Sequence, residues 1–147
     1  MKYFILSLIL LCCSVFVKGQ NQYSAEPSPV LLKERWEAEW ITCPESSLYD
    51  YGVYHFRKTL TLDSQLDSFI INISADNRYR LFVNGRPVCW GPARGDIYHW
   101  YFDTVDIASL LRPGKNVLAV LVWNFGSYTP GAQMTLKTGL IVQGNSS

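Results

Sequence analysis

The sequence predicts an all-β fold, specifically an antiparallel β-sandwich. Three observations lead to this prediction. Six or seven short segments have the alternating or continuously apolar pattern of strands. Turn residues, among them Asn84-Gly85 and Pro113-Gly114, separate these segments. No stretch after Gly19 has the length and periodicity of a long amphipathic helix.

The start of the chain, 1–19, is predicted to be a secretory signal peptide. Lys2 supplies a short positive segment, Tyr3–Val17 is almost entirely apolar, and Gly19 precedes a cleavage site at Gly19/Gln20. The apolar run is shorter than the roughly 20 residues that a membrane-spanning helix needs. We therefore expect a secreted or periplasmic protein without a membrane span.

The rest of the chain divides into three predicted parts. Residues 20–34 begin with a polar stretch containing two prolines and are expected to be a flexible leader. Residues 35–144 carry the strand pattern of one β-sandwich domain, and residues 145–147 form a tail. The net charge of +1 includes Lys2 and Lys18, so the remaining chain is close to neutral. Because it has no basic stripe, nucleic acid is not an expected partner.

The domain opens with "RWEAEWIT", in which Trp36 and Trp40 are four positions apart. One helical turn would place both on one face, and we expect that face to pack on the core. Residues 54–62 alternate between apolar and polar side chains, and residues 69–75 repeat the pattern. Both segments are therefore predicted to be half-buried strands.

The second half supplies the remaining elements. "YRLFVNGRPV" predicts a hairpin that turns at Asn84-Gly85, where both positions need a positive φ. "YHWYF" is predicted to be a short strand and "IASLL" a helical turn. "NVLAVLVWNF" is apolar on both faces, which predicts a central strand between two layers, and "MTLKTGLIV" supplies the last strand.

Two cysteines, Cys43 and Cys89, remain after the predicted cleavage. An oxidising compartment would permit a disulfide between them, and the alternative is two buried free thiols. A zinc site is not expected because the chain has no C-x-x-C motif.

Motifs for catalysis are absent from the sequence. It contains no G-x-S-x-G, H-E-x-x-H or Walker loop. Glycoside hydrolysis needs two carboxylates that flank the scissile bond, and the spacing of Asp96, Asp103 and Asp106 does not show that any two converge. We expect Asp103 and Asp106 to serve a turn and a helix cap. Enzymatic activity of this chain alone is therefore not predicted.

Aromatic residues gather between positions 90 and 123, namely Trp90, Tyr98, Trp100, Tyr101 and Trp123. A tryptophan offers a flat apolar face and one N–H donor, which suits the mixed surface of a pyranose. Arg94, Asp96, Asn124 and Gln133 could add directional hydrogen bonds. Carbohydrate is therefore an expected partner, although the alternative is that at least half of these aromatics belong to the core.

From Trp36 onward the chain resembles the N-terminal β-sandwich domain of bacterial α-L-rhamnosidases. The matching stretches are "WEAEWI", "YHFRKTLTL", "ISADNRYRLFVNGRPV", "GPARGDIYHWYFDTVDIASLLRPGKNVLAVLVWNFG" and "AQMTLKTGLIVQG". The resemblance implies a galactose-binding-like jelly roll that lies beside a helical catalytic barrel, in enzymes that remove terminal L-rhamnose. That barrel, which carries the family's catalytic carboxylates, has no counterpart in this sequence, so the resemblance implies a separate or missing catalytic domain.

Some modules of this kind bind L-rhamnose through calcium, and the resemblance assigns candidate residues for such a site. Asp76 and Asn77 look like two metal ligands, Asn124 and the carbonyl of Pro130 like two more, and Trp100 like the aromatic on which the sugar rests. Asp76-Asn77 also suits an ordinary turn between strands. The proposed sugar contacts are completed by Arg94, Asp96 and Trp123.

Three functional hypotheses follow from the sequence. The first is a secreted accessory module that binds rhamnose-type sugars. The second is a structural docking domain of a truncated rhamnosidase, with no sugar site of its own. The third is part of a glycoside hydrolase that acts on α-L-rhamnosides.

Overall fold

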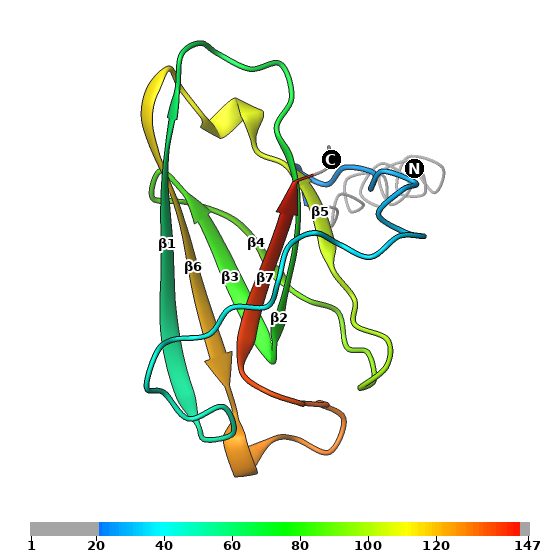
Figure 1. Ribbon diagram of the computed structural model, residues 1–147. Helices are drawn as coiled ribbons and strands as arrows, with labels where there is room; N and C mark the ends of the chain where they lie inside the picture. The colour runs from blue at the N-terminus through cyan, green and yellow to red at the C-terminus, as the bar shows by residue number, and fades with distance from the viewer. Residues whose placement is uncertain (1–20, 145–147) are drawn as a thin grey trace, which may run out of the picture.

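A computed structural model describes residues 21–144, which form two antiparallel β-sheets packed face to face (Figure 1). The four-stranded sheet has the order β1 (Gly52–Leu62), β6 (Gly114–Asn124), β3 (Arg78–Val83) and β4 (Arg86–Gly91). The three-stranded sheet has the order β5 (Asp103–Asp106), β2 (Ile70–Asp76) and β7 (Gly139–Gly144). The predicted all-β sandwich is confirmed. The predicted signal peptide (1–19) and tail (145–147) lie outside the described residues.

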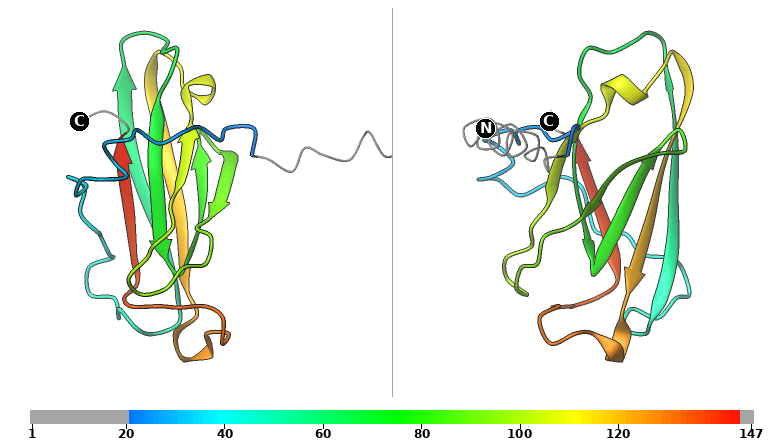
Figure 2. Two further views of the ribbon diagram at one scale, coloured as in Figure 1. Left: turned by 90° about the vertical axis from the view of Figure 1, so that its right-hand side faces the viewer. Right: turned by 180° about the vertical axis from the view of Figure 1, so that it is seen from behind.

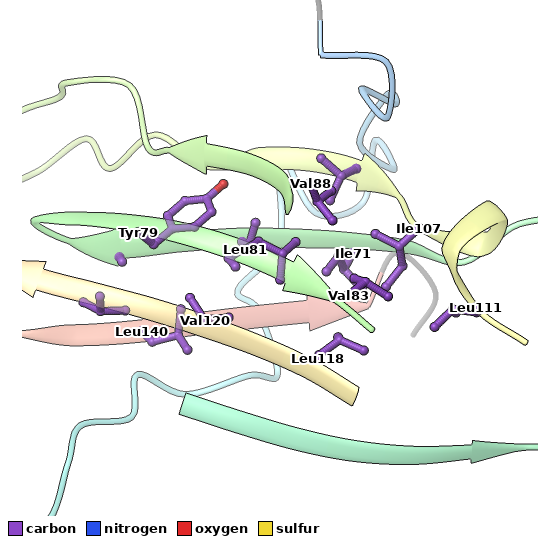
Figure 3. Close-up of a cluster of buried hydrophobic side chains, with 14 residues drawn as sticks. Ile71, Tyr79, Leu81, Val83, Val88, Ile107, Leu111, Leu118, Val120 and Leu140 are labelled. Atoms are coloured by element: carbon purple, nitrogen blue, oxygen red, sulfur yellow. The ribbon is translucent and has the colours of Figure 1, made fainter. Parts of the chain in front are cut away.

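The core lies between the two sheets and follows from strand alternation. In β2, Ile71, Ile73 and Ala75 are buried, and so are Leu118, Val120 and Val122 of β6. Figure 3 shows Ile71 on one sheet and Leu118 and Val120 on the other. Alternate residues in a strand point to opposite faces, so each strand contributes one apolar row. Burying each large apolar side chain contributes roughly 1.5–3 kcal/mol to folding.

The Asn84-Gly85 hairpin is confirmed. Asn84 has φ 50° and Gly85 has φ 80°, the left-handed values that this two-residue turn requires. The Asn84 side chain also accepts the Val117 N–H and donates to the Leu110 carbonyl, at 2.9 Å each. The turn therefore also ties β3 to β6 and to the short 3-10 helix η1 (Ala108–Leu110), where a helical turn was predicted.

Two predicted elements are wrong. Residues 98–102 are not a strand, because the Asp96 carboxylate accepts the N–H groups of Tyr98 and His99 and bends the chain into a turn. Residues 36–40 contain no helical turn, and the segment instead runs extended across β7 (Figures 1 and 2). Backbone bonds of 2.9 Å between Ile41 and Leu140, in both directions, hold it there.

The boundaries of the last two strands also differ from expectation. β7 begins at Gly139 rather than at Met134, because the N–H groups of Leu136 and Lys137 donate to the Asp76 carboxylate and not to a neighbouring strand. In β6, one face is buried, whereas the outward residues from Val117 to Trp123 are half-exposed. The sequence predicted a layer on both sides of this strand, and residues 21–144 supply a layer on one.

The segment before the sandwich is attached to it. Residues 21–25 fall in the stretch expected to be a flexible leader, and here they run beside β5. The Ala25 N–H donates to the Thr104 carbonyl at 3.0 Å, and the Asp106 N–H donates to the Tyr23 carbonyl at 2.8 Å. Cys43 and Cys89 are free thiols that are not bonded to each other. Within residues 21–144, no helix is long and apolar enough to cross a membrane.

Candidate carbohydrate-binding groove

A groove lies on the outer side of the three-stranded sheet, between the segment that precedes β1 and the connection from β4 to β5. Its mixed half is a cavity of about 610 Å³ with Ser74 and Ile141 of the sheet among its lining residues. The side chains around it combine aromatic and charged groups: Arg35, Trp36, Glu39, Trp40, Trp100 and Phe102. The groove therefore offers flat apolar surfaces next to hydrogen-bonding groups.

An apolar half of about 330 Å³ adjoins the mixed half. Ile41, Leu48 and Leu136 line it with aliphatic side chains, and Thr138 and Gly139 are also part of its wall. Trp40 and Trp100 line both halves. The two tryptophans are thus the residues that both cavities of the groove share.

Contacts on both sides of the groove position its aromatic residues. The ring centroids of Trp40 and Trp100 are 5.7 Å apart at an interplanar angle of 64°, and those of Trp36 and Phe102 are 5.0 Å apart at 73°. Such edge-to-face pairs contribute about 0.5–1.5 kcal/mol beyond burial. The Ser74 hydroxyl donates to the carbonyl of Tyr101 at 2.7 Å and so anchors the second pair of aromatics to β2.

The segment that carries Trp36 and Trp40 is likewise held by specific bonds. The Ala38 N–H donates to Gln143 Oε1 at 2.8 Å, and the Trp36 indole N–H donates to the Leu31 carbonyl at 3.0 Å. Trp40 nevertheless remains 45% exposed. It is therefore available to a ligand, whereas the sequence had favoured a place in the core for it.

The predicted sugar-contacting residues do not form one cluster. Trp100 lines the groove as the platform prediction requires, and Asp76 reaches its apolar half. Arg94 and Asp96 lie on the β4–β5 connection without lining either half of the groove. Trp123 is on the outer face of the other sheet, opposite Val53 of β1.

Three of the four predicted calcium ligands do converge, at the end of the sandwich where β2 and β6 finish. Asp76, Asn77 and Asn124 are each at most 2% exposed. Asn77 accepts the Phe125 N–H at 2.8 Å, and Asn124 accepts the Gly126 N–H at 2.7 Å and donates to Thr138 Oγ1 at 2.6 Å. The carbonyl of Pro130, on an exposed loop, accepts the Gln133 N–H at 2.8 Å.

The candidate calcium ligands are engaged in hydrogen bonds within the protein. Asp76 Oδ2 accepts two N–H groups, from Leu136 at 2.6 Å and Lys137 at 2.7 Å, and Asp76 Oδ1 accepts the Asn77 amide at 2.5 Å. All the candidate oxygens thus already accept an N–H, and calcium needs six to eight oxygen ligands. Residues 21–144 hold no cluster of three or more acidic, His or Cys side chains suited to a metal. The three side chains instead anchor the 125–138 loop, and calcium stays a prediction of the resemblance.

The carboxylates considered for catalysis point to different partners. Asp103 accepts the hydroxyl of buried Tyr79 at 2.5 Å, whereas Asp106, further along the same strand, accepts the N–H groups of Phe69 and Ala108 at 3.0 Å each. Asp96 contacts His99 Nδ1 at 2.9 Å on an exposed turn. Asp106 accepts the N–H of Ala108, the first residue of η1, although the N-cap residue itself is Ile107, and Asp103 lies in β5 rather than in the expected turn. This arrangement offers no pair of carboxylates facing one site.

These environments shift the pKa values in opposite directions. Burial raises the pKa of the Asp103 carboxyl, although the Tyr79 hydrogen bond and the Arg78 charge counteract part of that rise. Burial tends to raise the pKa of Asp106 too, but its three hydrogen bonds, from Phe69, Ala108 and Ser68, bring it below the usual value. Burial also raises the pKa of the Cys89 thiol to about 11, so this thiol stays protonated and unreactive at neutral pH.

Sequence reasoning missed several groove residues, namely Arg35, Trp36, Glu39, Trp40 and Phe102. A signal was present in "RWEAEW", where charged residues flank both tryptophans. In an extended segment, charges at alternate positions lie on one face and Trp36 and Trp40 on the other, so the pattern indicates an extended segment packed on a sheet but not an exposed tryptophan. The position of Phe102 depended on the turn at Asp96, which the pattern of alternating residues did not reveal.

No protein-family model matches the sequence, and no curated protein matches it significantly. Among solved structures, the GH78 family rhamnosidase of Bacillus sp. GL1 aligns with 74% of this chain at 34% identity and a TM-score of 0.67. The Streptomyces avermitilis α-L-rhamnosidase, solved with L-rhamnose, aligns with 82% of this chain at 23% identity and a TM-score of 0.54. This chain spans about 12% of the length of either enzyme.

Proposed function

We propose that this chain is a carbohydrate-binding module of a GH78-type α-L-rhamnosidase system. The premise is that the chain corresponds to one β-sandwich domain of such an enzyme. The Trp40–Trp100 groove is the proposed binding site. One observation carries the proposal: two partly exposed tryptophans contact each other and line both an apolar cavity and a mixed one. The proposal includes export to the cell exterior or periplasm, in line with the predicted signal peptide.

The two halves of the groove suit the two sides of a deoxy sugar. L-Rhamnose carries a methyl group where most hexoses carry a hydroxymethyl group, and the apolar half formed by Ile41, Leu48 and Leu136 is suited to that methyl. Arg35 and Glu39 in the mixed half supply a donor and an acceptor for ring hydroxyls. The faces of the tryptophans contact the C–H surface of the ring.

The proposed site makes few polar contacts, so we expect weak binding. A dissociation constant near 1 mM corresponds to about −4.1 kcal/mol. No chemical step is assigned to the chain, because Asp96, Asp103 and Asp106 each bind a different partner. A module of this kind acts by keeping a substrate-bearing glycan close to a catalytic domain, which raises the local concentration.

The test is calorimetric titration of the wild type, Trp40→Ala and Tyr98→Ala with L-rhamnose. Tyr98 is 83% exposed on the β4–β5 connection and does not line the groove, so Tyr98→Ala is a matched control for loss of an exposed aromatic. We expect Trp40→Ala to weaken binding at least fivefold and Tyr98→Ala to leave it unchanged. Equal affinity in a folded Trp40→Ala protein would exclude the groove. Absence of heat with folded wild type would favour the structural docking role.

A further inference from the structure

The outer face of the four-stranded sheet is a second surface, on the opposite side of the sandwich from the groove. Two rows of side chains cross it. Trp90 lies opposite Arg80, Arg80 opposite Leu121, and Leu121 opposite His55. In the next row Phe82 lies opposite Ala119, and Ala119 opposite Arg57. We call this surface the arginine face, defined by His55, Arg57, Arg80, Phe82, Trp90 and Leu121.

The arginine face is segregated in charge. Every charged side chain in the sequences of β1, β3, β4 and β6 is basic, and none of these strands contains Asp or Glu. The strands of the other sheet contain the opposite set, Asp76, Asp103 and Asp106. The exposed charged side chains of the arginine face, Arg57 and Arg80, are thus both basic, and neighbouring cations on one surface attract anions.

The aromatic groups of this face are interleaved with its cations. Trp90 is 78% exposed beside Arg80, and the Arg80 guanidinium carbon lies 5.2 Å from the ring centroid of Phe82. A guanidinium held over an aromatic ring keeps its edge donors free for another partner. The row therefore combines a stacking surface with a forked donor suited to carboxylates.

The outward residues of β6 add an apolar strip where an open sheet face would ordinarily be polar. Leu121 and Ala119 are half-exposed between the two arginine-bearing strands. Arg80 and Arg57 lie on either side of β6 in adjacent rows, so they are two strand spacings and two residues apart, roughly 12 Å. The face is open along this line, so it suits an extended ligand that carries repeated negative charges.

We propose that the arginine face binds an acidic polysaccharide, a chain built of uronic acids. Its carboxylates pair with Arg80 and Arg57, and its pyranose C–H faces contact Trp90 and the apolar strip. The inference does not depend on the groove, because the two surfaces belong to different sheets. A module with both surfaces would hold a neutral deoxy sugar at one and an anionic backbone at the other.

The test is affinity electrophoresis of the full mature chain in gels containing polygalacturonate or fully methyl-esterified polygalacturonate. We expect retardation by polygalacturonate, little by the ester, and a decrease with added salt. The double variant Arg57→Ala/Arg80→Ala should lose at least tenfold in affinity, and Trp90→Ala several-fold. Because these side chains are exposed, the variants are expected to remain folded.

Matched controls separate this site from general charge effects and from the groove. Arg112→Ala removes an exposed arginine outside the face, and Tyr128→Ala removes an aromatic that is 81% exposed. Both should bind as wild type, and so should Trp40→Ala even where rhamnose binding is lost. The proposal is overturned by equal retardation in the ester, by equally strong binding of poly(dT), by unchanged affinity in Arg57→Ala/Arg80→Ala, or by no retardation. It is also overturned if sedimentation shows that this face instead mediates self-association.

Discussion

Replacing Tyr79 by Phe tests the polar cluster inside the sandwich, because it removes one hydroxyl and leaves the ring in place. Tyr79 has no exposed surface, and its hydroxyl donates to Asp103 Oδ2 at 2.5 Å. Burial raises the pKa of Tyr79 far above its usual value, so the hydroxyl is a donor throughout the working range. A hydrogen bond to a charged group contributes about 1.5–3 kcal/mol to the free energy of unfolding, and we expect Tyr79→Phe to lower that free energy by this amount at pH 7.

The loss should depend on pH in a defined direction. Burial raises the pKa of Asp103 in the folded state above its unfolded value of about 3.9. The contribution of this carboxyl to the free energy of unfolding is therefore fully present below that unfolded value and is lost as the pH rises through the folded-state pKa. The Tyr79 hydrogen bond opposes that rise in pKa, so Tyr79→Phe raises the pKa of Asp103 further and enlarges the loss. Below pH 4 the bond is neutral, and the difference should fall to about 1 kcal/mol.

Urea unfolding followed by tryptophan fluorescence at pH 3.5 and pH 7 measures both values. Tyr54→Phe is a control, because its hydroxyl donates at 3.2 Å to the Ser47 carbonyl at an exposed site. A substitution at such a site typically changes the free energy of unfolding by no more than about 0.5 kcal/mol. A Tyr79→Phe difference at pH 7 as small as that of Tyr54→Phe, or one that is equal at both pH values, would show that the Tyr79–Asp103 bond does not stabilise the fold in this way.

Three further predictions concern stability. Asp76→Ala leaves the N–H groups of Leu136 and Lys137 without their acceptor. We expect the free energy of unfolding to fall by about 2–3 kcal/mol and the 130–138 loop to be cleaved faster by a protease. An unchanged urea midpoint and an unchanged cleavage rate would contradict the anchoring role. Gly91→Ala places a methyl group onto Asp103 Oδ2 beside Tyr79, so we expect thermal unfolding to show a free energy of unfolding lower by about 1–3 kcal/mol. A wild-type Tm would show that the cluster relaxes freely. Asp106→Ala removes a carboxylate whose pKa is lowered in the fold. The free energy of unfolding should fall by about 0.5–2 kcal/mol at pH 7, and by progressively less as the pH falls below about 4. A difference that stays constant to pH 2 would point to packing rather than charge.

The sequence was sufficient for the fold because strand alternation and turn chemistry are local. The row from Ile71 to Ala75 and the Asn84-Gly85 turn each require information from a few neighbouring residues. Predictions failed where a distant or side-chain acceptor captured the backbone. Asp96 bends the expected strand at 98–102, and Asp76 holds Leu136 and Lys137 away from β7.

The candidate site was less accessible to sequence reasoning because it is assembled across the sheet. Trp100 was identified, but its partner Trp40 lies far earlier in the chain, before β1, and reaches the groove through the pairing of Ile41 with Leu140. No local pattern encodes that pairing. The apolar outward side of β6 was visible in the sequence, but its two-layer interpretation required a covering element that residues 21–144 do not supply.

We propose that the Trp40–Trp100 groove binds a rhamnose-type sugar without the help of a metal. The most direct measurement is calorimetric titration of the mature chain, from Gln20, with L-rhamnose, first with calcium and then with a chelator. The groove account predicts saturable heat with a millimolar dissociation constant that the chelator does not change and that Trp40→Ala abolishes or strongly weakens. Heat that vanishes on chelation would contradict it and would return the site to Asp76, Asn77 and Asn124.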